Sequence, residues 1–169
     1  LRRLLAAAAR FALRRYRPMI VGVTGSVGKT STREAIFTVL AAKYRVRRSE
    51  KNYNTEIGVP LAILGIPHHG RNIFRWVSAL FRVSFRVLFR ADEYPEILVL
   101  EIGADRPGDI AYLSRLAPPI CGVITAIGEI PVHVEFFAGP EELAREKAML
   151  IEALPPEGYA VLNFDDETI

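Results

Sequence analysis

The sequence predicts an α/β fold in which helices cover both faces of a mostly parallel sheet, giving a three-layer sandwich. Two observations predict it. Short apolar runs rich in β-branched residues alternate with longer amphipathic stretches, which favours parallel strands joined by crossover helices. The first apolar run also leads into a glycine-rich turn and then a helix. The chain has 169 residues, 50% of them hydrophobic and 24% charged, enough for one domain with a buried core.

Each element follows from its local pattern. Four short apolar runs are predicted as buried strands, over residues 19–24, 97–102, 121–127 and 159–163. Helices are predicted over residues 1–16, 29–43 and 141–154, with a short apolar element over 59–64 and Pro107 in the first turn of a further helix. The polar residues 49–57 are predicted to form a loop. Ligands bind at the carboxyl ends of parallel strands, so functional residues are expected there.

Charge is divided unevenly along the chain. Residues 1–90 contain 18 Lys and Arg against 3 Asp and Glu, whereas residues 91–169 contain 4 against 16. The first half is therefore expected to offer a basic surface to phosphates, nucleic acid or an anionic membrane, and the second half could hold metal ions. The chain begins at Leu1 rather than Met, so we expect a fragment of a longer protein. No apolar run reaches the ~20 residues that a membrane-spanning helix needs.

Residues 24–31 have the pattern of a phosphate-binding P-loop between a strand and a helix. Gly25 and Gly28 let backbone N–H groups close around phosphate oxygens, Lys29 adds a positive charge, and the Thr30 hydroxyl can ligate Mg²⁺. The strict pattern has glycine where this chain has Val23. The alternative is a strand-to-helix turn with a solvated lysine. The predicted nucleotide-binding residues are Thr24, Gly25, Ser26, Val27, Gly28, Lys29, Thr30 and Ser31.

The run GVTGSVGKTST, with its glycine shifted by one place, resembles the ATP-binding central domain of the Mur ligases. Later segments are similar as well: residues 52–60, 101–104, 127–137, Lys147 and 162–166. The resemblance covers about residues 19–166. It implies a P-loop sandwich that uses ATP and Mg²⁺ in a ligase that forms amide bonds in peptidoglycan precursor synthesis. Residues 101–110 are most similar to the branch that adds D-alanyl-D-alanine to UDP-N-acetylmuramoyl-tripeptide.

The resemblance implies roles for residues outside the loop. Glu101 would hold Mg²⁺ against ATP oxygens, and His133 would help to hold a second metal ion. Lys147 matches a lysine that is carbamylated in several Mur ligases, which turns a cation into an anionic metal ligand. The predicted substrate-binding residues are Asn52, Asn54 and Thr55. The predicted catalytic residues are Lys29, Glu101, His133 and Lys147, and the predicted metal ligands are Thr30, Glu101, His133 and Lys147.

Each of these side chains also has an ordinary structural explanation. Glu101 could be a strand-end ion-pair partner, and His133 a packed or surface histidine. Lys147 could be a solvated helix lysine paired with Glu142 or Glu146. The asparagines could simply make turns.

Three further features are predicted to lie outside the nucleotide and metal site or at its edge. His68 and His69 are interpreted as a turn, because no further metal ligand follows at suitable spacing. Asp165 and Asp166 fit a nucleotide contact and a surface turn equally well. Cys121 is interpreted as a buried strand thiol without a disulfide partner, which favours a reducing cytoplasm.

The predicted division is a basic amphipathic helix over residues 1–17 and an ATP-binding domain over 18–169, with an insertion over 67–94 and without a C-terminal domain. In the first helix Leu1, Leu4, Leu5, Ala8 and Phe11 have helical spacing. In the insertion Arg71, Arg75, Arg82, Arg86 and Arg90 fall on one stripe, while the rest is largely covered by Phe74, Trp76, Val77, Leu80, Phe81 and Leu88. This composition is typical of a helix lying on anionic lipid. The alternative is a helix packed on its own sheet or on the first helix.

The expected function is therefore an ATP-dependent ligase whose partners are a UDP-N-acetylmuramoyl-peptide and a dipeptide, in the cytoplasm. Its alternatives are a membrane-attached nucleotide-binding module without catalysis, a small-molecule kinase, and a folylpolyglutamate-type ligase. Membrane contact at the inner face is a further expectation. Nucleic acid is not an expected partner, because no nucleic-acid-binding motif accompanies the charge.

Overall fold

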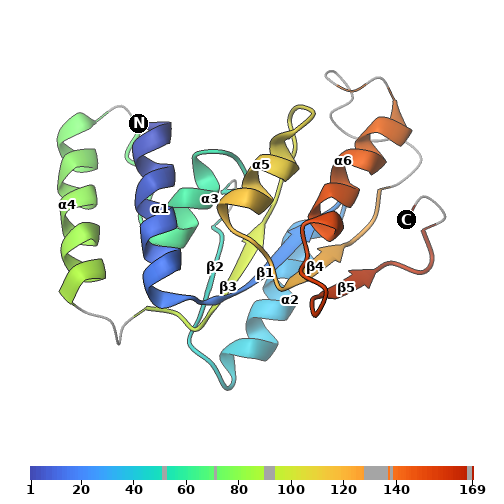
Figure 1. Cartoon of the computed structure of the whole chain (residues 1–169), viewed down its shortest axis with the longest axis horizontal. Helices are drawn as coiled ribbons and strands as arrows, with labels where there is room; N and C mark the ends of the chain where they lie inside the picture. The colour runs from blue at the N-terminus through green and yellow to red at the C-terminus, as the bar shows by residue number, and fades with distance from the viewer. Residues whose placement is uncertain (51–52, 71, 90–93, 128–136, 138, 167–168) are drawn as a thin grey trace.

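The structure is a computed structural model that describes residues 1–50, 53–70, 72–89, 94–127, 137, 139–166 and 169 (Figure 1). Its centre is a sheet of five parallel strands in the order β2-β3-β1-β4-β5. The strands are β1 (Met19–Thr24), β2 (Val46–Arg48), β3 (Ile97–Glu101), β4 (Cys121–Ile124) and β5 (Tyr159–Leu162). Val23 pairs with Glu101, and Thr24 with Ile124, so three strands end at the same edge of the sheet. The predicted parallel α/β fold is confirmed.

The described part of the chain contains six helices: α1 (Arg2–Tyr16), α2 (Lys29–Ala41), α3 (Gly58–Leu64), α4 (Ile73–Phe89), α5 (Asp109–Leu116) and α6 (Pro140–Glu152). Alternate residues of β1 and β3 point to opposite faces. Val23 and Val99 face α2, whereas Leu98 lies in the main core with α1, α3 and α5. Helices therefore cover both faces, as the three-layer prediction requires.

Two details differ from the sequence prediction. β2 was not predicted, because its three residues include two arginines and carry too little apolar pattern for a strand. Pro107 precedes helix α5 instead of lying in its first turn: Gly108, at a φ of 91°, is the N-cap, and the helix begins at Asp109. Both differences concern short segments whose conformation depends on neighbouring strands and loops.

Helix α1 buries one of its two apolar sides. Leu5 is buried, but Leu1, Leu4 and Phe11 are at least half exposed. The buried side consists of Leu5, Ala6, Ala9 and Ala12. Small alanine side chains let α1 lie close to α3, against which it packs. Helical spacing alone did not indicate which side would be buried, because both sides of this helix are apolar and side-chain size distinguishes them.

Helix α4 lies outside the three layers and packs against α1 (Figure 1). Trp76, Ala79 and Val83 join the main core, so this face fits the alternative of packing on the first helix. Arg75 and Arg82 are exposed, as the basic stripe requires. Arg71 and Arg90 lie outside the described residues. Among the described helices, none combines the length and apolarity needed to span a membrane.

Candidate functional site

The predicted phosphate loop connects β1 to α2 at the carboxyl edge of the sheet. Its backbone depends on two glycines with positive φ, Gly25 at 143° and Gly28 at 86°. A Cβ atom on Gly25 would lie 2.0 Å from the Thr125 hydroxyl oxygen, so no larger residue fits there without rearrangement. The loop leads directly into the N-terminus of α2, which begins at Lys29. Backbone N–H groups at a helix N-terminus favour a bound anion.

Residues at the end of β4 hold this loop in place. The backbone N–H of Ser26 donates to the carbonyl of Ala126 at 2.6 Å. The Thr125 hydroxyl donates to the carbonyl of Val27 at 2.6 Å, and its backbone N–H bonds to the carbonyl of Thr24 at 3.0 Å. Sequence reasoning missed Thr125, because a threonine after a strand carries no functional signal of its own.

Two lysines converge on one carbonyl oxygen of the loop. Lys29 Nζ donates to the Gly25 carbonyl at 2.7 Å and to the Ser26 carbonyl at 3.0 Å. Lys147 Nζ reaches the same Gly25 oxygen at 3.1 Å from α6, and Lys147 is only 4% exposed. The alternative of a solvated, paired Lys147 is therefore wrong. The two ammonium groups concentrate positive charge where the terminal phosphates of a nucleotide would lie.

Burial shifts the pKa values of both lysines. Desolvation lowers the pKa of Lys29, and the Glu101 carboxylate partly offsets this. Desolvation and the charge of Lys29 together lower the pKa of Lys147 to about 8, against the opposing effect of Glu146. Lys147 is consequently an amine that releases its proton near neutral pH.

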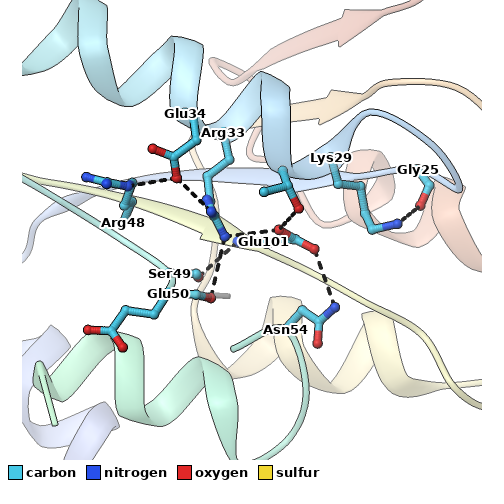
Figure 2. A network of polar contacts seen from close by, with 10 residues as sticks. Gly25, Lys29, Arg33, Glu34, Arg48, Ser49, Glu50, Asn54 and Glu101 are labelled. Carbon is cyan, nitrogen blue, oxygen red and sulfur yellow. Dashed lines mark hydrogen bonds and ion pairs between the residues drawn. The ribbon is translucent and has the colours of Figure 1, made fainter. Parts of the chain in front are cut away.

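Glu101 ends β3 beside the loop and is 6% exposed (Figure 2). Its carboxylate accepts hydrogen bonds from the Thr30 hydroxyl at 3.2 Å and from the Arg33 guanidinium at 3.1 Å. Arg33, 2% exposed, also bridges to Glu34, which in turn binds Arg48. In this structure Glu101 is therefore an ion-pair partner of Arg33, as its structural explanation predicted. Arg33 was missed, because a charged helix residue is normally solvated.

The predicted substrate loop lies against Glu101. The Asn54 side-chain N–H donates to Glu101 at 3.4 Å, and the backbone carbonyl oxygen of Asn54 accepts from the N–H of Gly103 at 2.8 Å. The Thr55 hydroxyl accepts from the N–H of Gly58 at the start of α3, at 3.4 Å. Asn54 therefore adjoins the site, whereas the Thr55 hydroxyl is used in a local cap. Asn52 lies outside the described residues.

The donor set around the loop fits a nucleotide with Mg²⁺. The hydroxyl oxygens of Thr24 and Ser26 are buried and have no hydrogen-bond partner among the described residues, which is typical of groups that a ligand completes. Thr30 and Glu101 supply the hard oxygen ligands that Mg²⁺ prefers. Ser31 is exposed on α2. His133 lies outside the described residues, and within those residues no cluster of three His, Cys, Asp or Glu side chains forms.

Glu146, next to Lys147, has a separate structural role. Its carboxylate accepts the backbone N–H groups of Gly108 and Ile110, both at 2.8 Å, at the start of α5. This is a buried helix cap, which neutralises the positive end of the α5 dipole. A residue 36 positions away supplies it, so no local sequence pattern could have predicted it.

The Asp166 carboxylate accepts the N–H of Ile127 at 2.7 Å, at the end of β4. The Asp165 N–H bonds to the Asn163 side chain in a turn. Cys121 is half-buried in β4, and burial raises its thiol pKa, which does not favour a nucleophile.

The two histidines form the predicted turn. The His68 ring accepts the N–H of Gly70. The rings of His68 and His69 both pack edge-on against Trp76, with centroids 5.6 and 5.5 Å away. They therefore secure the start of α4.

Comparison with known proteins agrees with this geometry. The Mur ligase middle domain family matches residues 23–74 and 83–169, so the unmatched segment 75–82 lies within α4. The UDP-N-acetylmuramoyl-tripeptide–D-alanyl-D-alanine ligases of Bacillus subtilis and Mycobacterium leprae are 35% and 33% identical over 147 and 150 residues. These alignments cover 87% and 89% of this chain but 26% and 24% of the relatives. The chain thus spans about a quarter of the length of the curated relatives it matches.

Solved structures give the same result. MurF ligase from Thermotoga maritima in complex with ADP has a TM-score of 0.74 and 36% identity, covering 98% of this chain and 32% of that one. Escherichia coli FolC in complex with ADP is more distant, with a TM-score of 0.55 and 18% identity over 95% of this chain and 41% of that one, and shows the fold alone. The loop, the strand-end carboxylate and these matches lead to one conclusion: the chain belongs to the Mur ligase middle-domain family.

Proposed function

We propose that this chain is the ATP-binding domain of a ligase that joins D-alanyl-D-alanine to UDP-N-acetylmuramoyl-tripeptide. The observation that carries the proposal is the convergence of Lys29 and Lys147 on Gly25, beside Glu101 and Thr30. The proteins named as this ligase in Bacillus subtilis and Mycobacterium leprae support the substrate assignment.

In the proposed reaction, a terminal carboxylate oxygen of the tripeptide attacks the γ-phosphorus of ATP, and ADP leaves. The amine nitrogen of D-alanyl-D-alanine then attacks the acyl carbon, inorganic phosphate leaves, and the amine loses a proton. Lys29 and the loop N–H groups neutralise charge on the transferring phosphoryl group. Lys29 must exchange its bonds to the Gly25 and Ser26 carbonyls for phosphate oxygens. The fixed loop thus contributes placement and charge neutralisation, without a covalent bond to the protein.

Thr30 and Glu101 are the residues that would hold Mg²⁺ in this domain. A bound Mg²⁺ would neutralise phosphate oxygens and orient them for transfer. Arg33 keeps the Glu101 carboxylate in place until then, because their ion pair is buried. His133 is proposed as a ligand of a second metal ion, through the family resemblance.

Lys147 is proposed to become a carbamate. Carbamylation needs a neutral amine, which attacks CO₂ and releases a proton, and a pKa of about 8 leaves roughly a tenth of Lys147 neutral at pH 7. The resulting anion would add a negative charge beside the loop to that of Glu101.

This can be tested by carbon-13 NMR of the full-length protein after equilibration with labelled bicarbonate. At fixed dissolved CO₂, a carbamate resonance should grow between pH 7 and 9 and disappear in Lys147→Arg. The Lys43→Arg variant, at an exposed lysine, should keep the resonance. A signal that survives Lys147→Arg would assign the carbamate to another amine.

The substrate loop is proposed to bind the peptide substrate through Asn52 and Asn54. Asn54 adjoins Glu101, so its amide is within reach of groups that approach the phosphates. Thr55 is proposed to have a structural role in this loop, because its hydroxyl already accepts the N–H of Gly58 at the start of α3.

The reaction is tested by phosphate release from the full-length protein that carries this domain. Mg-ATP, UDP-N-acetylmuramoyl-tripeptide and D-alanyl-D-alanine are supplied together and then omitted one at a time. Release that requires all three, with a product heavier by the dipeptide, is the expected result. Release without the dipeptide, or with a folate substrate instead, would contradict the proposal.

A further inference from the structure

Helix α4 has two apolar faces. The first, made of Trp76, Ala79 and Val83, is buried in the main core. The second, here called the phenylalanine stripe, consists of Phe74, Phe81, Phe85 and Phe89, which are 84%, 72%, 52% and 70% exposed. At about 100° per residue the stripe spans roughly 80° of the helix and lies nearly opposite the buried face.

Four exposed aromatic side chains on one helix face need an explanation. Scattered exposed apolar residues are ordinary, but contiguous apolar patches mark interaction surfaces. The rings of Phe85 and Phe89 lie 4.8 Å apart, so the stripe is partly continuous. The helix already has a core-facing side, and the stripe is therefore not required for folding.

One border of the stripe is cationic. Arg75 and Arg82 are exposed and lie about 20–40° beyond Phe89 around the helix. No Asp or Glu occurs between residues 73 and 89. An aromatic centre with a basic edge on one side and no acidic residue matches a surface that is apolar inside and anionic at its edge.

The neighbouring helix repeats this pattern. On α1, which packs against α4, Leu4 and Phe11 are 65% and 50% exposed, and Arg3 is exposed beside them. A hollow of about 500 Å³ adjoins the same helix, and its lining combines Arg10, Arg14, Arg17 and Arg115 with five apolar residues. Within the described part of the chain, none of these four arginines forms an ion pair with a carboxylate. Such a hollow fits the phosphate of a lipid headgroup.

We propose that the α4 side of this domain docks on an anionic membrane surface. The phenylalanine stripe enters the boundary between headgroups and acyl chains, and Arg75, Arg82, Arg10 and Arg14 bind lipid phosphates. In an antiparallel pairing with α4 of a second copy, one basic border would lie against another, which like-charge repulsion disfavours. α4 and the Lys147-bearing α6 lie at opposite ends of the molecule, so docking leaves the nucleotide site open (Figure 1).

The test is vesicle flotation of the full-length protein at low salt, with phosphatidylcholine vesicles and with vesicles that also contain about 30% phosphatidylglycerol. Binding is expected only to the anionic vesicles and should weaken as salt rises. The double variants Phe81→Ser/Phe85→Ser and Arg75→Gln/Arg82→Gln should each lower the membrane partition constant by about tenfold.

Matched controls lie on other helices. Val39→Ser removes a 73% exposed apolar side chain from α2, and Arg145→Gln removes an exposed charge from α6. Both should bind as the unmodified protein does. Absence of binding to anionic vesicles, or binding that the stripe variants do not change, would overturn the proposal. A dimer in solution that Phe81→Ser/Phe85→Ser dissociates, without vesicle binding, would assign the stripe to a second copy instead.

Discussion

The phosphate loop and helix α4 carry similar residue types in opposite circumstances. At the loop, Lys147 and Arg33 are almost completely buried, and each is bonded within the protein. On α4, Arg75 and the phenylalanine stripe face outward. The charged groups at the loop are buried at a cost in solvation free energy, and a ligand can use these charges. The charged groups on α4 remain solvated and can adapt their positions. The contrast indicates that the first region is built for one small ligand and the second for a broad surface.

The largest expected effect compares two aromatic residues of α4. Trp76→Ala should lower the free energy of unfolding by about 3–5 kcal/mol, because Trp76 is 5% exposed and leaves a cavity in the main core. Phe81→Ala, at a 72% exposed position, should change it by less than about 0.5 kcal/mol. Urea unfolding of both variants measures the difference. Equal losses would mean that the phenylalanine stripe is part of the fold.

Arg33→Met should cost about 3–5 kcal/mol of stability, because it leaves the buried Glu101 carboxylate without its cationic partner. The double variant Arg33→Met/Glu101→Met should recover most of this loss, since it removes both charges together. The same unfolding measurement applies. A single variant as stable as the original protein would show that the Glu101 site is better solvated than its burial indicates.

Gly25→Ala should weaken nucleotide binding about a hundredfold, because the new Cβ atom displaces Thr125 and distorts the loop. Gly70→Ala is the matched control: Gly70 also has a positive φ, of 56°, but no atom lies within 4 Å of its Cβ position. Titration calorimetry with ATP separates the two variants. Similar affinities in both would contradict a requirement for close packing at Gly25.

Lys29→Ala should lower the rate of substrate-dependent phosphate release at least about tenfold, since one charge on the transferring phosphoryl group is lost. Lys43→Ala, at an exposed position of the same basic half, should retain the rate. Steady-state kinetics of the full-length protein provide the readout. Normal turnover by Lys29→Ala would remove the loop lysine from the proposed reaction.

The order of the main elements could be predicted from the sequence, because each depends on a local pattern. The run from β1 through the glycine loop into α2 has its own apolar, glycine and helix signals. Glu101 and Lys147 meet the loop as the strand-end rule and the family resemblance predict. The metal role of His133 stays a prediction, because that residue is outside the described part of the chain.

Other features depend on partners that are distant in sequence. The burial of Arg33 needs the Glu101 carboxylate from another strand, and the role of Thr125 needs the loop beside β4. Periodicity also could not decide which of two apolar faces would be buried on α1 or α4. In both helices the choice was made by packing against a neighbour.

Two adjacent residues of α6 hold two different parts of the molecule. Glu146 binds the start of α5, and Lys147 binds the phosphate loop, because successive helix residues point about 100° apart. The two segments are therefore mechanically linked through one rigid helix. A substitution that displaces α6 is therefore expected to disturb the phosphate loop and the start of α5 together.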